Sequence, residues 1–221
     1  YEAQKQKKGA KPIVEPKEPV EKSLFVAANS SATAMYETLA ENQETGWDIG
    51  YASPTLTKYI DGISDKNTAI LIPGCGNAYE AAYLLQQGFT NITLIDIAPL
   101  AVENLKQKYE GNSAIRILCE DFFEHQGAYD LILEQTFFSA IPPFRRNDYA
   151  TKMHELLNEN GSLVGVLFNK EFNNPFPPFG GSENEYRTLF QSQFNIKKLE
   201  ESYNSIPPRQ GSELFIHFIK K

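Results

Sequence analysis

The stretch Ala69-Ile-Leu-Ile-Pro-Gly-Cys-Gly-Asn-Ala-Tyr-Glu-Ala-Ala-Tyr-Leu-Leu85 decides the fold of this chain. Residues 69–72 form a short apolar run, which is typical of a buried parallel strand. Residues 78–87 have the apolar spacing of a helix. Gly74 and Gly76 lie between the two, where a backbone without side chains lets a ligand come close. Strand, glycine-rich turn and helix in this order predict a ligand crevice at the carboxyl end of the strand.

The rest of the chain continues this alternation. Further strands are expected at 92–96, 115–118, 129–134 and 162–169, and further helices at 36–43, 54–60, 99–109 and 146–157, the last ended by Asn160-Gly161. Alternating strands and helices predict an α/β fold with a doubly wound, mostly parallel sheet. The runs 195–203 and 213–219 are joined by the turn-rich link 207–211 without a helix, which predicts an antiparallel C-terminal hairpin.

Length and composition predict one globular domain with a tail. The first 22 of the 221 residues are rich in Lys, Glu and Pro, so we expect residues 1–35 to be a flexible tail or linker and 36–221 to be the domain. Residues 1–35 hold six Lys and four Glu, which leaves 15 basic and 24 acidic groups, a net charge of −9, on the domain. Such acidity argues against a nucleic-acid partner.

The cysteines and the hydropathy of the chain indicate where in the cell it is expected. Cys75 and Cys119 sit in apolar runs rather than in a spaced framework, so free thiols and a reducing, cytoplasmic location are expected. No apolar run approaches the roughly 20 residues of a membrane span. We therefore expect a monomer that acts on a small molecule, with no membrane partner.

The crevice favours S-adenosylmethionine (SAM) over a dinucleotide. The loop has the pattern Gly-x-Gly-x-x-Tyr and lacks the third glycine that pyrophosphate binding requires; SAM has no phosphate and tolerates the bulkier Tyr79. Asp96 ends the second strand, 20 residues after Gly76, where a carboxylate accepts hydrogen bonds from ribose hydroxyls. The alternative for Asp96 is an acid that stabilises the N-terminus of the helix beginning at Pro99.

Two further polar segments follow the third and fourth strands. Glu120-Asp121-Phe122-Phe123 offers an acid and an aromatic ring that suit an adenine, although an acidic surface turn before a core phenylalanine explains it as well. Glu134-Gln135 ends the fourth strand, which lies beside the first in a doubly wound sheet, so its polar groups should face the cofactor. Phe137 and Phe138 follow as pocket wall or as core.

Trp47 is the one tryptophan and lies in the glycine-flanked segment 45–51. It is either a lid over a bound ligand or an anchor for the N-terminal arm. The three histidines, His125, His154 and His217, are scattered without metal-ligand spacing, so no metal site is predicted.

Together, six segments resemble the thiopurine S-methyltransferase superfamily, and most of all its plant branch of thiol, thiocyanate and halide methyltransferases. These segments are GWDIGYASPTL, LIPGCGNAYEAAYL, LIDIAPLAVE, EDFF, YDLILEQTFFSAIPP and NSIPPRQGSELF, in order from about residue 36 to the C-terminus. The resemblance implies a Rossmann-like, seven-stranded sheet, SAM as cofactor and an N-terminal helix that closes over it.

Residues and resemblance together give a set of predicted cofactor contacts: Tyr36, Trp47, Gly74, Gly76, Asp96, Ile97, Asp121, Phe122, Glu134 and Gln135. The chain departs from the plant branch at three of its positions. Tyr36 and Ala40 stand where those relatives have tryptophans, and Gln135 stands where they have tyrosine. A looser lid follows from Ala40, which cannot stack as a tryptophan does.

The resemblance implies a small, soft methyl acceptor: a thiol, hydrosulfide, thiocyanate or halide. Such a nucleophile already carries its lone pair, so no catalytic base is assigned. The predicted acceptor pocket contains Phe138, Phe176, Phe179 and Arg209, where Arg209 either attracts an anion or is an ordinary surface arginine. The competing hypotheses are an NAD-dependent oxidoreductase and a non-catalytic SAM-binding module.

Overall fold

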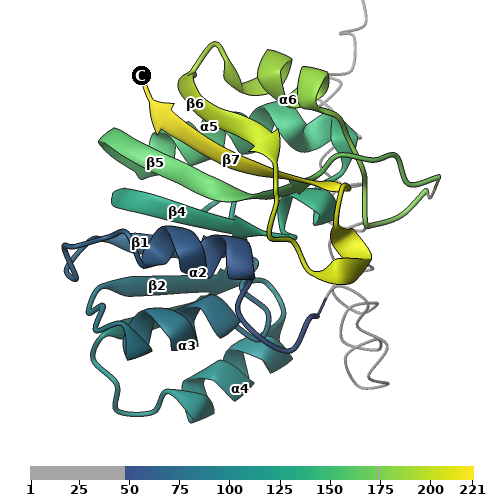
Figure 1. Cartoon of the computed structure of the whole chain (residues 1–221). Coiled ribbons are helices and arrows are strands. Elements are labelled where there is room, and N and C mark those ends of the chain that lie inside the picture. Colours follow the sequence, from purple (N-terminus) through teal and green to yellow (C-terminus); the bar gives the residue numbers. More distant parts are fainter. Residues whose placement is uncertain (1–47, 174) are drawn as a thin grey trace, which may run out of the picture. The chain divides into compact units, whose positions relative to one another are not determined.

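The structure, a computed structural model, describes residues 48–173 and 175–221, and seven strands of these residues form one sheet (Figure 1). Its strand order is β3-β2-β1-β4-β5-β7-β6. Strands β1 to β5 run parallel to one another, and β7 runs antiparallel to both β5 and β6. The strands are β1 (Ile70–Pro73), β2 (Ile92–Asp96), β3 (Ile115–Cys119), β4 (Tyr129–Gln135), β5 (Leu157–Phe168), β6 (Phe194–Glu201) and β7 (Glu213–Lys220).

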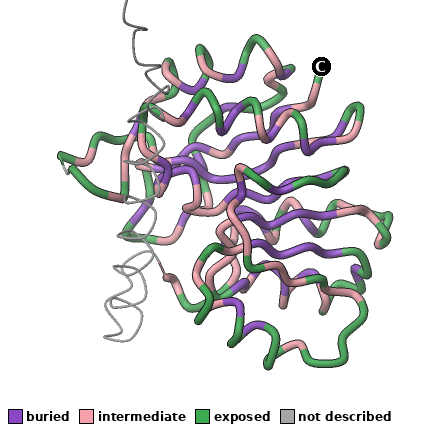
Figure 2. Tube along the Cα trace, turned by 180° about the vertical axis from the view of Figure 1, so that it is seen from behind, coloured by how far each residue is buried: buried purple, intermediate pink, exposed green. Residues whose placement is uncertain are grey.

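Helices cover both faces of the sheet, and each face has its own core. The helices are α2 (Pro54–Ile60), α3 (Tyr79–Gln86), α4 (Pro99–Lys108), α5 (Arg146–Leu156) and α6 (Glu183–Phe190), with short 3-10 turns η1 (Phe138–Ala140), η2 (Pro143–Arg145) and η3 (Pro207–Arg209). Side chains alternate along β1, so Ile70 and Ile72 pack with Leu84 of α3, whereas Leu71 packs in the other core with Tyr149 of α5. The strands are the buried centre of Figure 2.

The predicted fold class is confirmed: an α/β, doubly wound sheet of seven strands with an antiparallel C-terminal pair. Strand 92–96 matches the prediction, and the others differ by one or two residues except at β5. The predicted end of α5 at Asn160-Gly161 is wrong. The helix ends at Leu156 and β5 starts at Leu157, with Asn160 inside the strand at φ +62°.

Helix α6 was not predicted from the sequence. Its N-cap residue Ser182 accepts a hydrogen bond from the backbone N–H of Glu185 at 3.4 Å, and Tyr186 and Phe190 are its buried residues. The pattern Ser182-x-x-Glu185 is the sequence signal of such a cap, and it follows directly on a pair of glycines.

Several predictions fall outside the described residues. The tail 1–35, the helix 36–43, Tyr36 and Trp47 all lie there. Within the described ranges, no helix has the length and apolar character to cross a membrane. Cys75 and Cys119 are both free thiols.

The topology brings distant segments to one edge of the sheet. The parallel strands β1, β2, β4 and β5 all end at this edge. Because β7 runs in the opposite direction, it begins there, and its first residue Glu213 is paired with Phe168 at the end of β5. The residues that follow β1, β2 and β4 therefore share this edge with Glu213.

Gly165 provides a test of how tightly β4 and β5 pack. A Cβ at Gly165 would lie 2.4 Å from Cβ and 2.6 Å from the carbonyl oxygen of Glu134. We expect Gly165→Ala to lower the free energy of unfolding by about 2 kcal/mol or more, since backbone and core must shift to accept the methyl group. Urea unfolding measures this, with Gly62→Ala as control, because its Cβ would meet only Tyr59 O at 3.4 Å. Equal losses in the two variants would contradict the packing.

Candidate cofactor and acceptor site

The loop between β1 and α3 depends on its first glycine. Gly74, Gly76 and Ala78 have positive φ angles of +57°, +48° and +50°. A Cβ at Gly74 would lie 2.2 Å from Cδ2 of Phe137, so only glycine fits against this ring. A Cβ at Gly76 would meet nothing within 4 Å. The loop is thus closed towards β4 at Gly74 and open beside Gly76.

Asp96 holds this loop from the end of β2. Its carboxylate accepts the backbone N–H of Gly76 and that of Ala98, each at 2.9 Å. Burial raises the pKa of Asp96 above its ordinary value, and the backbone amides of Ala98, Gly76 and Ile97 lower it in part. Ala98 is the N-cap residue of α4, so the alternative interpretation, an acid at this helix N-terminus, is also part of the observed geometry.

Asp48, which the sequence analysis did not single out, joins the N-terminal side of the described chain to the same loop. It accepts hydrogen bonds from Asn77 Nδ2 at 2.5 Å and from the Tyr79 hydroxyl at 3.1 Å. The buried Glu80 accepts the backbone N–H of Ser53 at 2.9 Å. The sequence signal for Asp48 was the Trp-Asp segment, in which this aspartate directly follows the predicted lid residue Trp47.

The turn after β3 carries the predicted adenine contacts. Asp121 Oδ1 accepts the backbone N–H of Phe123 at 2.9 Å, and Phe122 is 4% exposed, with its ring centroid 5.1 Å from that of Phe137. Beneath the turn, His125 is buried between Glu120 and the hydroxyl of Tyr129, the latter at 2.8 Å. The histidine thus braces the turn internally, a role its position in the sequence did not suggest.

Glu134 and Gln135 point to different surroundings. Glu134 is fully buried and accepts the backbone N–H of Phe138 at 2.9 Å and the hydroxyl of Tyr149 at 2.5 Å. Both carboxylate oxygens thus have protein donors, and the predicted cofactor contact of Glu134 is not tested by this geometry. Gln135 Oε1 is buried without a hydrogen-bond partner in the described part of the chain. Its amide oxygen is therefore an acceptor that a ligand can use. Ile97, also predicted as a contact, is 42% exposed.

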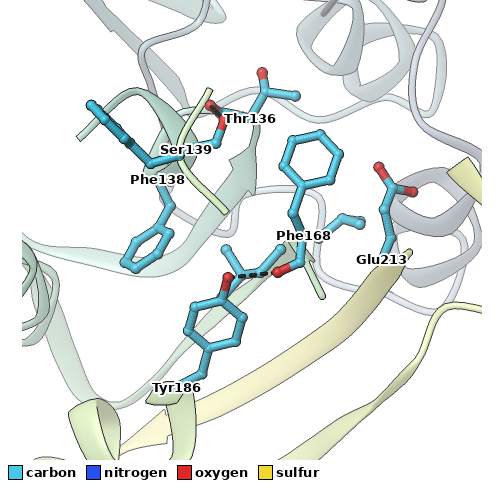
Figure 3. A pocket seen from close by; sticks show the side chains of 9 residues that line it. Thr136, Phe138, Ser139, Phe168, Tyr186 and Glu213 are labelled. Atoms are coloured by element: carbon cyan, nitrogen blue, oxygen red, sulfur yellow. Dashed lines mark hydrogen bonds between the residues drawn. The ribbon is translucent and has the colours of Figure 1, made fainter. Parts of the chain in front are cut away.

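A narrow pocket opens beyond the ends of β4 and β5 (Figure 3). It holds a volume of about 10 Å³, room for about one water molecule. The Tyr186 hydroxyl donates to the carbonyl of Phe168 at 2.6 Å across it. Its lining residues are Thr136, Phe138, Ser139, Val166, Leu167, Phe168, Phe179, Tyr186 and Glu213.

Three of the four predicted acceptor residues lie in or next to this pocket. Phe138 and Phe179 line it, and Arg209 pairs with the lining residue Glu213 through Nη1 and Oε1 at 3.4 Å. Arg209 is only 8% exposed, so its interpretation as a surface arginine is wrong. Phe176 is 55% exposed and does not line the pocket.

A second hollow lies on the outer side of the glycine loop. It has a volume of about 240 Å³ and extends from Gly76 and Asn77 to α4. Lys108 on α4 donates to the carbonyl of Asn77 at 3.4 Å at this place.

The described residues contain no group of three His, Cys, Asp or Glu side chains placed to hold a metal ion.

The strand order, with its antiparallel C-terminal pair, is that of the class I methyltransferase fold. The sequence model of the family described as thiopurine S-methyltransferase matches residues 32–216, and the chain belongs to this family. It is an S-adenosylmethionine-dependent methyltransferase.

Curated relatives include a probable thiol methyltransferase 2 of Arabidopsis thaliana, 29% identical, with 86% of this chain and 85% of the relative covered. Thiocyanate methyltransferase 1 of Brassica oleracea is 28% identical, with 80% and 81% covered. Thiopurine S-methyltransferase of Acinetobacter baylyi is 25% identical, with 72% and 84% covered.

The fold is similar to that of solved methyltransferases. A Burkholderia thailandensis 1,6-didemethyltoxoflavin-N1-methyltransferase with bound S-adenosylhomocysteine has a TM-score of 0.69 at 18% identity, over 95% of this chain and 94% of that one. A SAM-dependent methyltransferase from Corynebacterium glutamicum has a TM-score of 0.63 at 20% identity, over 87% and 100%.

The buried Glu134 predicts a pH-dependent stability. Burial raises its pKa from 4.5 to about 7, although bonds from Tyr149 and the Phe138 and Phe137 amides lower it in part. Between these values the folded protein binds more protons than the unfolded chain, so the free energy of unfolding falls as pH rises from about 4.5 to about 7. The effect is on the order of 3 kcal/mol and is constant above that range.

The measurement is the difference in unfolding free energy between the wild type and Glu134→Gln, which does not titrate, from urea melts at several pH values. Taking this difference also removes the contribution of His217 to the pH dependence, because both proteins contain this histidine. Its pKa is lowered to about 4 by burial and then by Lys197 and Lys198, which gives a slope of opposite sign. A difference that does not change between pH 4.5 and 7 would contradict the buried carboxylate.

Proposed function

We propose that this methyltransferase transfers the methyl group to a small soft nucleophile: a thiolate, hydrosulfide, thiocyanate or halide. The observation that carries the proposal is the pocket at the ends of β4 and β5, which is narrow and mostly apolar. Its lining residues Thr136 and Phe138 flank Phe137, whose ring lies against Gly74 of the glycine loop. Room for about one water molecule favours the smaller of these acceptors over an aromatic thiol. The names of the plant relatives, a thiol and a thiocyanate methyltransferase, support the same class.

The residues at the ends of β1 and β4 fit SAM. Gln135 has a buried acceptor oxygen without a partner among the described residues, and SAM carries an ammonium group, ribose hydroxyls and an adenine amine as donors. The space beside Gly76 is open. When bound, the cofactor supplies the electrophilic methyl group of its sulfonium. We propose these described residues as its contacts: Gly74, Gly76, Asp96, Ile97, Asp121, Phe122 and Gln135; Tyr36 and Trp47 remain proposals from the resemblance.

The chain's own groups orient the acceptor and exclude water from it. An acceptor that is already anionic needs positioning and desolvation rather than a base. The Tyr186 hydroxyl is engaged by the Phe168 carbonyl and burial raises its pKa, so it keeps its proton. Arg209 offsets the negative charge of Glu213, which would otherwise repel an anion from this pocket.

We further propose a monomeric cytoplasmic enzyme whose partner is a small molecule, with neither nucleic acid nor membrane involved. Support comes from the net charge of −7 and the two free cysteines. The match to a methyltransferase family argues against the alternative of an NAD-dependent oxidoreductase.

Asp96→Asn tests the cofactor site. An asparagine has one acceptor oxygen where the carboxylate has two, and its NH2 group cannot accept a backbone N–H. We therefore expect SAM affinity to fall about tenfold to 100-fold in a protein that still folds. Calorimetric titration with SAM measures it. Asp130→Asn is a matched control, because Asp130 also accepts a backbone N–H, that of Ala69 at 3.0 Å, but at the start of β4. Unchanged SAM affinity in folded Asp96→Asn would overturn the assignment.

An acceptor panel tests the methyl acceptor. Methyl transfer from labelled SAM to iodide, thiocyanate, hydrosulfide and thiophenol is followed under identical conditions. We expect kcat/KM for at least one of the three anions to exceed that for thiophenol by about tenfold or more, since a ring does not enter the pocket without moving its walls. A preference for thiophenol would refute the small-anion proposal. No turnover with any acceptor, despite tight SAM binding, would favour a binding module.

A further inference from the structure

We propose that Glu134 and Tyr149 act as one positioning pair, which holds the turn of residues 136–139 as a wall of the acceptor pocket. This inference rests on the proposed function, and it gives Glu134 a role distinct from the cofactor contact that the sequence predicted. Neither side chain lines the pocket. Both therefore act through the turn and not on the substrate.

The pair is sealed inside the protein. Glu134 and Tyr149 are each 0% exposed, and the tyrosine hydroxyl donates to Oε2 at 2.5 Å. The other oxygen, Oε1, accepts the backbone N–H of Phe138. Gly165 on β5 leaves the space that the Glu134 side chain needs, since its missing Cβ would overlap with it. A buried carboxyl group with a donor at each oxygen fixes the positions of both donors, because losing either one leaves a buried oxygen without a hydrogen bond.

The turn that Glu134 holds is otherwise unfavourable. Thr136 has a φ of +64°, a conformation rare for a β-branched residue. Its hydroxyl donates to the carbonyl of Gln135 at 2.6 Å, and the hydroxyl of Ser139 donates to the carbonyl of Thr136 at 2.7 Å. The carbonyl of Ser139 in turn accepts the backbone N–H of Phe179 at 2.7 Å. Four lining residues, Thr136, Phe138, Ser139 and Phe179, therefore depend on this one turn.

The same turn also reaches the cofactor loop. Phe137 lies against Gly74, and its ring centroid is 5.1 Å from that of Phe122 and 6.1 Å from that of Tyr149. One face of the turn thus contacts the proposed cofactor residues while the other forms the acceptor pocket. We expect the acceptor side to respond more strongly when the pair is broken, because the glycine loop also has its own hydrogen bonds to β2, from Cys75 N–H to the Ile95 carbonyl at 3.2 Å and from Gly76 N–H to Asp96.

The test uses the full chain with Glu134→Gln, Tyr149→Phe and the double variant. With iodide as acceptor and saturating SAM, we expect each single variant to raise the acceptor KM about tenfold, the usual worth of one hydrogen bond to a buried charge. The Kd for SAM should change less than threefold. The double variant should be no worse than the worse single variant, because the two residues act as a unit.

Tyr83→Phe is the matched control. It also removes a tyrosine hydroxyl that donates to a carboxylate, Asp61 Oδ1 at 2.5 Å, but on α3 and away from the pocket. A purely structural role for Glu134 and Tyr149 would lower kcat with the folded fraction and leave the KM for iodide unchanged, which would overturn the proposal. A rise in the SAM Kd as large as the rise in KM would also overturn it, in favour of a cofactor contact.

Hydrogen exchange separates this proposal from the proposed function. In Glu134→Gln and Tyr149→Phe, peptides that contain residues 136–139 should exchange faster, while peptides that contain Gly76 and Ala98 should not change. A wild type inactive on every acceptor would overturn the proposed function alone. The pair would then be judged by exchange, where unchanged protection of the turn refutes it and faster exchange supports it.

Discussion

The close approach of Phe137 to Gly74 is the constraint around which the site is arranged. These residues follow β4 and β1, the two neighbouring strands between which the chain changes from one face of the sheet to the other. A crevice opens at such a place because the connections leave in opposite directions. Phe137 fills the side of it towards β4, and only a residue without Cβ can face that ring. The glycine loop therefore contacts this ring, while the residues on either side of Phe137, Thr136 and Phe138, line the pocket.

Carboxylates bonded to backbone amides hold the remaining parts of this edge. Asp96 takes the amides of Gly76 and Ala98, Glu80 takes that of Ser53, and Glu134 takes that of Phe138. Burial raises the pKa of all three acids, and the bonds from backbone amides return part of that cost. Each acid thereby fixes a loop to a strand or helix. This keeps the irregular backbone of the loops in place, where the regular backbone hydrogen bonds of a helix or sheet are absent.

The sequence predicts the sheet well because buried parallel strands are continuous apolar runs between clear turn residues. Strand 92–96 is an example, and the hairpin of β6 and β7 follows from its short proline-rich link. Features set by tertiary partners were missed or misjudged. Arg209 looked like a loop residue, yet Glu213 four residues later draws it into the interior. The direction of Glu134 depends on Tyr149 of α5, a partner that no local pattern reveals. Likewise, Asp48 has meaning only once Asn77 and Tyr79 lie beside it.

Gln135 has a buried amide oxygen without a partner among the described residues, at a position where the resemblance to the plant branch implies a tyrosine. A buried amide oxygen without a partner costs about 1–3 kcal/mol, whereas a tyrosine ring in the same place would bury apolar surface at little such cost. The penalty disappears when a ligand supplies a donor to Oε1. If the cofactor binds Gln135 as proposed, part of its free energy of binding is the removal of a cost already present in the folded protein. Under the proposed function, such relief favours a ligand with a hydrogen-bond donor, as the cofactor is, over a bare anionic acceptor. Under the proposed function, acceptor choice then depends on the turn after Gln135, in which Glu134 accepts the backbone N–H of Phe138.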